Sequence, residues 1–204
     1  MKKIISIDGN IGSGKSTLIK KLQEKTNLVV ITEPVDSWMK MYDENGKNLL
    51  ELFYENQEKY AFLFQLTAYI TRLQTWRDAN QDNIIISERS IWTDFHVFAK
   101  MLYDDKKITQ LEYNIYLLWI QGFQQEFKLE KIIYINTTPE KCYERIHKRN
   151  RDGEVIPLDY LKKCHDYHVS YLSDRNYLLI DGNEEFETND ELLDKMIEKI
   201  LNFI

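Results

Sequence analysis

A glycine-rich segment near the start of the chain precedes a lysine and a hydroxyl residue. Residues 9–16 read Gly-Asn-Ile-Gly-Ser-Gly-Lys-Ser and fit the pattern Gly-x-x-x-x-Gly-Lys-Ser/Thr at every fixed position. Glycines let a backbone wrap closely around phosphate oxygens, so that its N–H groups point inward. Lys15 is expected to reach the β- and γ-phosphates of a nucleotide, and Ser16 is expected to bind Mg²⁺. The residues expected around the phosphates are Gly9, Asn10, Ile11, Gly12, Ser13, Gly14, Lys15, Ser16 and Thr17.

The surroundings of this segment agree with a phosphate-binding loop. The apolar run Ile4–Asp8 comes before it, and an amphipathic helix with Leu18, Ile19 and Leu22 follows. A strand before such a loop and a helix after it form the context that supports the motif. GTPases share this loop, so it does not define the reaction. The chain lacks the Asn-Lys-x-Asp segment of GTPases, and a GTPase switch is therefore disfavoured.

Short apolar strands alternate with helices along the rest of the chain. Strands are predicted at Ile4–Asp8, Leu28–Thr32, Ile84–Ser87, Lys131–Asn136 and Tyr177–Asp181. Helices are predicted at Asn56–Ala79, Ile91–Tyr103, Leu111–Phe127, Leu158–Leu172 and Glu191–Phe203, another begins at Thr138, and residues 39–47 are predicted as a loop. This alternation predicts an α/β fold with a five-stranded parallel sheet flanked by helices.

Ionisable side chains follow the ends of the predicted strands. Glu33 comes directly after the second strand, and Glu88 and Arg89 come directly after the third. Ligands of open parallel sheets bind beyond the carboxyl ends of the strands, so these groups are expected near the phosphate loop. Glu33 could take a proton from an acceptor oxygen, Glu88 could help to hold Mg²⁺ directly or through water, and Arg89 could brace the acceptor.

A second group of basic residues lies farther along the chain. Arg145, Lys148 and Arg149 share one face of a predicted helix, and Arg151 follows. This face could close over a triphosphate as a lid.

The long helix predicted at 56–79 carries an unusual polar face. Gln65, Tyr69 and Arg72 are spaced i, i+4, i+7 and so share one face. That face is separate from an apolar stripe of Leu63, Leu66, Ile70 and Leu73. An amide, a phenol and a guanidinium on one face indicate a polar ligand.

Composition limits the class of protein. The chain has 204 residues, 43% of them hydrophobic, and a net charge of −6, which fits one globular domain over residues 1–204 and disfavours a nucleic-acid partner. Its two cysteines form no disulfide framework, and no apolar stretch nears the length of a membrane span. We therefore expect a cytoplasmic protein without a membrane or nucleic-acid partner.

Taken together, these segments resemble the deoxyribonucleoside kinase family over almost the whole chain. The order and spacing of the segments make the resemblance specific. The matching segments are Gly9–Thr17, Glu33–Trp38, Tyr54, Phe64-Gln65, Glu88–Ser90, Arg145–Glu154, Pro157–His168 and Asp181–Phe186. The resemblance implies a P-loop kinase fold with a short arginine-rich lid, about residues 145–157. It also implies transfer of the γ-phosphate of ATP, with Mg²⁺, to the 5′-hydroxyl of a deoxyribonucleoside in nucleotide salvage. The enzyme is implied to be a homodimer that pairs through the helices around Ile91–Tyr103 and Leu111–Phe127.

The resemblance also implies roles by matched position. Glu33 is implied as the general base and Arg89 as the group that orients the 5′-hydroxyl. Gln65 is implied to pair with the nucleobase, and Tyr54 and Glu154 to hold the 3′-hydroxyl. The remaining implied positions are Ile11, Trp38 and Phe98 around base and sugar, Arg145, Arg149 and Arg151 in the lid, and Glu184, Glu185 and Phe186 beside the ATP adenine.

Arg72 and Asp94 match an arginine and an aspartate of the deoxycytidine and deoxyguanosine kinases. Such a pair suits cytosine or a purine better than thymine, because mispaired buried polar groups discriminate strongly. We therefore expect deoxyadenosine, deoxyguanosine or deoxycytidine as the substrate, with no choice among the three.

Two other functions stay open at the level of the sequence. A nucleoside monophosphate kinase of the thymidylate type would share the fold and the loop, and Arg72 could serve its phosphorylated acceptor. A catalytically silent ATP-binding subunit would need neither Glu33 nor Gln65. Candidate base, metal and lid residues together favour the kinase.

Overall fold

The computed structural model describes residues 1–79, 84–151 and 153–204. Five strands form one sheet in the order β2-β3-β1-β4-β5, and every neighbouring pair is parallel. The strands are β1 (Lys2–Gly9), β2 (Val30–Ile31), β3 (Ile84–Glu88), β4 (Phe127–Asn136) and β5 (Tyr177–Asp181). The predicted α/β fold with a five-stranded parallel sheet is confirmed.

The helices lie on both faces of this sheet. They are α1 (Lys15–Lys25), α2 (Val35–Trp38), α3 (Leu49–Glu55), α4 (Gln57–Asp78), α5 (Ile91–Thr93), the π-helix η1 (Asp94–Ala99), α6 (Lys100–Asp104), α7 (Gln110–Phe123), the 3₁₀ turn η2 (Gln124–Glu126), α8 (Pro139–Arg149), α9 (Leu158–Leu172) and α10 (Asp190–Phe203). None of the helices in the described ranges combines the length and the apolar character that crossing a membrane requires.

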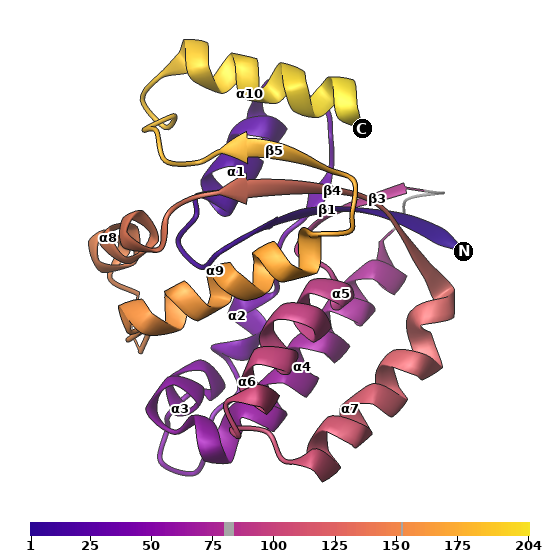
Figure 1. Ribbon diagram of the computed structural model, residues 1–204, viewed down its shortest axis with the longest axis vertical. Helices are drawn as coiled ribbons and strands as arrows, with labels where there is room; N and C mark the ends of the chain where they lie inside the picture. Colours follow the sequence, from indigo (N-terminus) through magenta and orange to yellow (C-terminus); the bar gives the residue numbers. More distant parts are fainter. Residues whose placement is uncertain (80–83, 152) are drawn as a thin grey trace.

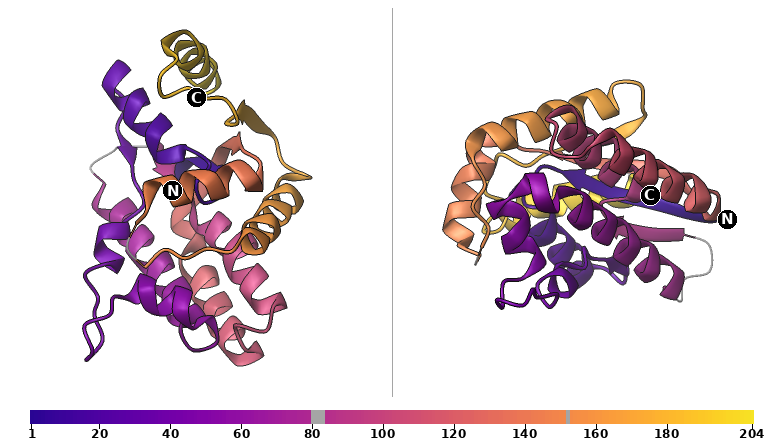
Figure 2. Two further views of the ribbon diagram at one scale, coloured as in Figure 1. Left: turned by 90° about the vertical axis from the view of Figure 1, so that its left-hand side faces the viewer. Right: turned by 90° about the horizontal axis from the view of Figure 1, so that it is seen from below.

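The two faces of the sheet have separate cores. In Figure 1, α1 and α10 lie above the sheet, and α4, α5, α7 and α9 lie below it. The left view of Figure 2 shows the same division, with α10 in yellow and α1 in dark purple in the upper part and the magenta helices at the bottom. Successive strand residues point to opposite faces. Ile5 and Ile7 accordingly pack in the core with α1 and α10, whereas Ile4 packs with Tyr69 and Trp76 of α4.

Several predicted boundaries were wrong. The second strand keeps only Val30–Ile31, because those residues alone pair with β3. The helix predicted at 111–127 ends at Phe123, and Phe127 instead begins β4 and packs its ring against Trp76. The helix predicted at 91–103 is divided by the π-helix η1.

Two short helices, α2 and α3, were not predicted. For α3 the chain did carry a signal. The Asn48 side chain caps the N–H of Glu51, and the Glu51 carboxylate accepts from the N–H of Asn48, which makes a capping box. This box turns the chain into α3 and places Phe53 and Tyr54 beside α4.

The two faces of α4 are arranged differently from the prediction. Gln65, Tyr69 and Arg72 are all buried, whereas Leu63 of the apolar stripe is 50% exposed. The polar face of α4 therefore points into the molecule. Tyr69 does not serve a ligand there, because its hydroxyl donates to the carbonyl of Trp119 on α7.

Candidate active site

The glycine loop connects β1 to α1 and is closely covered by other segments. Gly12 and Gly14 have φ angles of 77° and 96°, in the region that side chains rarely adopt. A Cβ atom at Gly12 would lie 2.6 Å from the carbonyl oxygen of Cys142 on α8, and one at Gly14 would lie 2.9 Å from the ring of Phe186. Both positions therefore require glycine for conformation and for space.

Lys15 is folded back onto this loop. Its Nζ donates to the carbonyl oxygens of Gly9, at 3.1 Å, and Asn10, at 2.7 Å. Burial, together with the nearby Arg89, lowers the pKa of Lys15 to about 7. Phosphate oxygens can replace these carbonyl acceptors, so the ammonium group stands ready for a polyphosphate.

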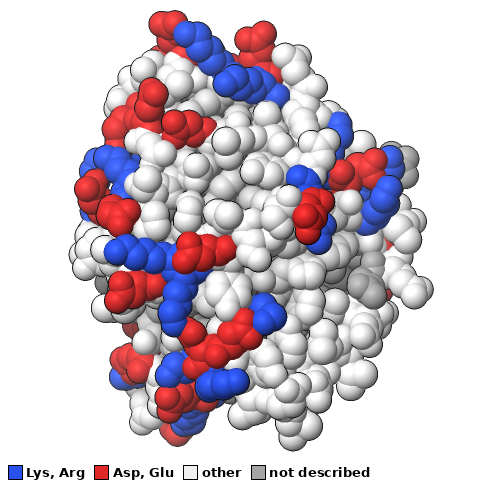
Figure 3. All heavy atoms as spheres, in the orientation of Figure 1, with Lys and Arg blue, Asp and Glu red and all other residues white. Residues whose placement is uncertain are grey.

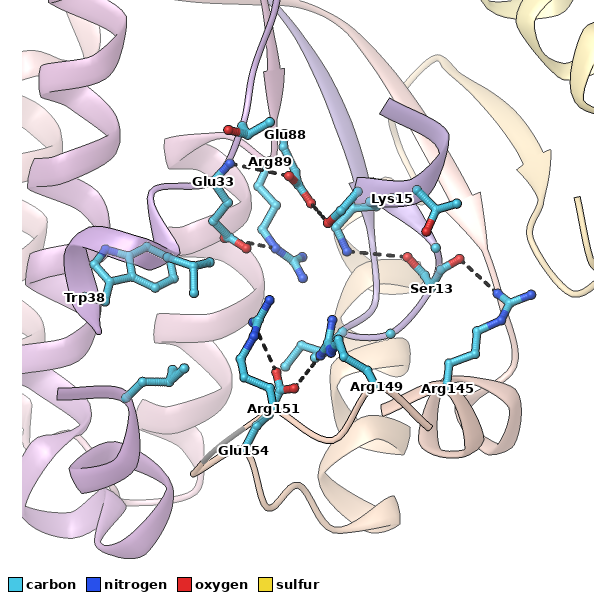
Figure 4. A pocket seen from close by; sticks show the side chains of 18 of the residues that line it. Ser13, Lys15, Glu33, Trp38, Glu88, Arg89, Arg145, Arg149, Arg151 and Glu154 are labelled. Atoms are coloured by element: carbon cyan, nitrogen blue, oxygen red, sulfur yellow. Dashed lines mark hydrogen bonds and ion pairs between the residues drawn. The ribbon is translucent and has the colours of Figure 1, made fainter. Parts of the chain in front are cut away.

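Carboxylates and arginines from the ends of β2 and β3 and from α4 meet beside the loop. Ser16 Oγ donates to Glu88 Oε1 at 2.8 Å, and the backbone N–H of Glu33 lies 3.4 Å from Glu88 Oε2. Glu33 Oε1 lies 2.9 Å from Arg72 Nη2 and 3.2 Å from Arg89 Nε. Figure 4 shows Glu33, Glu88 and Arg89 together beside Lys15. The fold therefore brings Glu33, Glu88 and Arg89 together beside the loop, as the sequence predicted.

The electrostatics of Glu33 favour its ionised form. Burial raises the pKa of this carboxyl group, but Arg89, Arg72 and Lys15 outweigh burial and hold the pKa below its usual range. Glu33 is consequently ionised at neutral pH.

Arg89 has a backbone conformation that is uncommon for a residue with a side chain. Its φ is 61°, in the left-handed region. Its Nη1 donates to the carbonyl of Gly9 at 2.8 Å, and its guanidinium carbon lies 4.7 Å from the centre of the Phe98 ring. Strained backbone of this kind concentrates at functional sites, where surrounding contacts hold it in place.

One cavity of about 800 Å³ joins these groups, a volume within the range of ligand sites. The predicted site residues that line it are Ile11, Gly12, Ser13, Gly14, Lys15, Ser16, Thr17, Glu33, Trp38, Tyr54, Gln65, Glu88, Arg89, Asp94, Phe98, Arg145, Arg149, Arg151, Glu154, Glu185 and Phe186.

Four predicted site residues do not line the cavity. Gly9 and Asn10 begin the loop but do not line the cavity, and the Asn10 side chain donates to the carbonyl of Leu161 on α9. Glu184 accepts from Arg145 through its backbone carbonyl. Arg72, which is 1% exposed, lies beneath the cavity, behind Glu33 and Asp94.

The part of the cavity around Trp38, Phe64 and Gln65 is apolar with a few polar groups. Trp38 and Phe64 meet edge to face with ring centres 5.2 Å apart. Gln65 and Asp94 are each 3% exposed. Burial raises the pKa of Asp94, and the Arg72 guanidinium opposes that rise. The pocket thus presents an amide and a carboxylate within aromatic walls.

Several lining residues were missed by the sequence analysis, among them Val35, Leu50, Phe53, Phe64, Ala68 and Tyr160. Phe53 stacks on Phe64 with ring centres 4.5 Å apart. The capping box before α3 could have indicated Phe53, and the spacing of Phe64 and Ala68 around Gln65 could have indicated the other wall. Val35 and Tyr160 lie in the matching segments Glu33–Trp38 and Pro157–His168 but were given no role there.

The arginine-rich segment meets the cavity at Glu154. The Glu154 side chain is 3% exposed and lies 2.5 Å from Arg149 Nη2 and 3.7 Å from Arg151 Nη1. Figure 4 shows both arginines pointing into the cavity around this carboxylate. Burial, with Glu154 nearby, raises the pKa of Tyr54.

Arg145 joins the glycine loop to the chain after β5. Its Nη1 donates to the carbonyls of Gly182, at 2.7 Å, and Ser13, at 3.3 Å. Its guanidinium also lies over the ring of Phe186, 5.9 Å from the ring centre. A flat cation and an aromatic ring therefore stand beside the phosphate loop.

A parallel sheet, a phosphate loop and a cavity lined by carboxylates and arginines define a P-loop phosphotransferase. Comparison with known proteins narrows this class. The deoxynucleoside kinase family matches residues 5–204. A probable deoxycytidine kinase of fowlpox virus (strain NVSL) is 37% identical, over 99% of this chain and 88% of that protein.

Two further relatives agree. The deoxycytidine kinase of Homo sapiens is 33% identical, over 99% of this chain and 91% of that protein. The mitochondrial deoxyguanosine kinase of Xenopus laevis is 30% identical, over 99% and 89%. The chain therefore belongs to the deoxynucleoside kinase family. It is a phosphotransferase of nucleotide salvage rather than a monophosphate kinase. The family implies that its phosphate donor is ATP.

Proposed function

We propose that this enzyme transfers the γ-phosphoryl group of Mg·ATP to the 5′-hydroxyl of a deoxyribonucleoside, with Glu33 as the general base. The observation that carries the proposal is the position of the Glu33 carboxylate. It lines the same cavity as Lys15, and two arginines hold it ionised. Arg89 orients the acceptor hydroxyl, and Lys15 leaves its loop carbonyls for the phosphates.

In this proposal Mg²⁺ is bound by the side chains of Ser16 and Glu88. A hydroxyl and a carboxylate are the hard oxygen ligands that Mg²⁺ prefers, with water and phosphate oxygens completing its shell. The 2.8 Å contact already holds the two oxygens together. The ion would neutralise the charge that develops on the transferring group.

Gln65 and Asp94 contact the nucleobase in this proposal, because both line the cavity and are buried beside its aromatic side chains. A carboxylate accepts hydrogen bonds and repels carbonyl oxygens. Adenine, guanine and cytosine carry an exocyclic amino group, whereas thymine carries none. We therefore favour deoxyadenosine, deoxyguanosine or deoxycytidine over thymidine.

The remaining contacts follow the two substrates through the cavity. Tyr54 and Glu154 hold the 3′-hydroxyl, and Ile11, Trp38 and Phe98 enclose base and sugar. Arg145, Arg149 and Arg151 form a lid, about residues 145–157, over the triphosphate. Glu184, Glu185 and Phe186 lie beside the adenine of ATP. In support, all but Glu184 line the cavity.

We also propose that residues 1–204 form one kinase domain that pairs with a second copy through α4 and α7. Four large apolar side chains on these helices are exposed: Leu63 (50%), Leu111 (69%), Leu118 (68%) and Trp119 (39%). Figure 3 shows few charged side chains at the lower right, over α7. Exposed apolar groups of this kind commonly mark an interface. A cytoplasmic location completes the proposal.

Phosphate transfer from Mg·ATP to each of the four deoxynucleosides, with dTMP as a parallel acceptor, tests the reaction. The proposal is supported if the wild type phosphorylates a deoxynucleoside and if Glu33→Gln lowers kcat on the order of 10²-fold or more. Turnover of dTMP alone would refute it. A strong preference for thymidine would refute only the proposed reading of the base by Asp94.

A further inference from the structure

Arg72 is a buried cation that does not reach the substrate cavity. It lies on α4, is 1% exposed and is absent from the cavity lining. Asp94 and Glu33, in contrast, both line the cavity. Any effect of Arg72 on a substrate must therefore pass through the residues that it contacts.

Those contacts join three parts of the site. Nε of Arg72 donates to Asp94 Oδ2 at 2.7 Å, and Nη2 donates to Asp94 Oδ1 at 3.2 Å. The same Nη2 donates to Glu33 Oε1 at 2.9 Å, and Nη1 donates to the carbonyl of Glu88 at 2.6 Å. Four of the five N–H donors of the guanidinium are thereby used.

This arrangement fixes geometry because a guanidinium is flat and rigid. A planar fork that binds two carboxylates holds both in defined directions, which a lysine cannot do. The π-helix η1 contributes to the same geometry, since Asp94 is its first residue and Phe98 lies in the same helix. π-helical turns are frequent at functional sites.

We propose that Arg72 is a positioning residue that ties the carboxylate facing the nucleobase, Asp94, to the general base, Glu33. A nucleobase that binds Asp94 fixes the position of Arg72. Arg72 in turn holds the Glu33 carboxylate in the direction of the 5′-hydroxyl. Recognition of the base then acts on kcat as well as on KM. This inference rests on the proposed function, since it uses Glu33 as the proton acceptor.

The electrostatic consequence has a definite sign. The cations that face Glu33 are Arg89, Arg72 and Lys15, and the neighbouring acids are Glu88 and Asp94. Removal of Arg72 takes away one of the three cations that lower the pKa of Glu33. The acid limb of the kcat–pH profile, where Glu33 gains its proton, must therefore move to higher pH.

The test uses the full-length enzyme and its best deoxynucleoside. Arg72→Ala is compared with the wild type and with Arg77→Ala. Arg77 lies on the same helix and binds Glu126 with two nitrogens, but it is exposed. Three quantities are measured: kcat against pH, kcat with added guanidinium chloride, and kcat and KM for an analogue that lacks the exocyclic amino group.

We expect Arg72→Ala to lower kcat on the order of 10²-fold and to move the acid limb to higher pH. Added guanidinium should raise the kcat of Arg72→Ala at least ~10-fold by filling the vacated site. It should leave the kcat of Arg77→Ala unchanged. In the wild type, loss of the amino group should lower kcat as well as raise KM. In Arg72→Ala the effect on kcat should disappear.

The inference is overturned if Arg72→Ala keeps kcat within about twofold of the wild type. It is equally overturned by a loss of rate with an unmoved acid limb and no guanidinium rescue. Should Arg72→Ala fail to fold, Arg72→Lys retains the charge without the fork, and an unchanged effect of the amino group on its kcat would reject the proposal. If the wild type phosphorylates no deoxynucleoside, the proposed function itself fails, which separates the two outcomes.

Discussion

Ser16 and Glu88, 72 residues apart in the sequence, share a hydrogen bond of 2.8 Å between hydroxyl and carboxylate. Ser16 stands at the start of α1, and Glu88 ends β3, the strand beside β1. The fold therefore brings together the two side-chain oxygens that we propose as ligands of Mg²⁺. Preorganised groups cost little reorganisation when the metal–nucleotide complex binds.

From this pair we predict that Glu88→Gln raises the Mg²⁺ concentration needed for half-maximal rate, on the order of 10- to 100-fold. The amide oxygen can still accept from Ser16, so the fold is retained, but the negative charge is lost. Rate against free Mg²⁺ at saturating ATP measures the effect. Glu44→Gln, an exposed residue, is the matched control, and an equal Mg²⁺ requirement in the two variants would contradict the assignment.

Glu154 leads to a prediction about the sugar. Its carboxylate is buried and neutralised by Arg149 and Arg151. In Glu154→Gln the proposed acceptor for the 3′-hydroxyl loses its charge, and a hydrogen bond to a charged group contributes about 1.5–3 kcal/mol. We expect the preference for a deoxynucleoside over its 2′,3′-dideoxy analogue to fall on the order of 10-fold or more.

The same substitution releases Arg149 and Arg151 for phosphate. The Kd of ATP alone should therefore stay equal or become smaller in Glu154→Gln, as calorimetric titration can show. Weaker ATP binding together with an unchanged sugar preference would mean that Glu154 only supports the structure of the lid segment.

The extent to which the site could be predicted differs from residue to residue. The glycine loop was predictable because its backbone needs glycine at positions such as Gly12, whatever surrounds it. Glu33, Glu88 and Arg89 were predictable as neighbours because parallel strands end at one edge of the sheet. Both arguments depend on local sequence and strand direction alone.

Other features depend on packing and left no readable pattern. Arg72 was placed on the correct face of α4, but whether it reaches the cavity depends on how α4 packs against β3 and η1. The π-helix η1 resembles an ordinary helix in sequence, because one extra residue in a turn changes no periodicity over so short a segment. Phe53 differs from these, because α3 is too short for its periodicity to be recognised but the capping box at Asn48 and Glu51 did mark the start of the helix.

The surface of α7 gives a prediction about assembly. Leu118 is 68% exposed on a helix whose single acidic or basic residue is Glu112. If α4 and α7 pair with a second copy, Leu118→Glu places a charge in that interface and should yield monomers, because an unpaired buried charge is costly. Sedimentation velocity measures the outcome. Val169→Glu on α9, at a residue 52% exposed, should leave the association unchanged, and a wild type that sediments as a monomer would reject the interface.

From the low pKa of Lys15 we predict how the affinity for ATP depends on pH. Burial and Arg89 lower the pKa of its ammonium group to about 7 in the free enzyme. The ammonium form binds phosphate, and the bound triphosphate raises the pKa again. Above a pH of about 7 the free enzyme must therefore take up a proton on binding ATP, and the Kd of ATP should rise by up to ~10-fold per pH unit.

Calorimetric titration of ATP between about pH 6 and pH 9 measures this slope, and buffers of different ionisation enthalpy measure the proton uptake directly. Lys15→Arg keeps its charge throughout that range, so its slope should vanish whatever its absolute affinity. Arg89 must stay in place in both proteins, because its charge contributes to the low pKa of Lys15. An equal slope in the wild type and in Lys15→Arg would assign the titration to another group and show that Lys15 is already fully charged in the free enzyme.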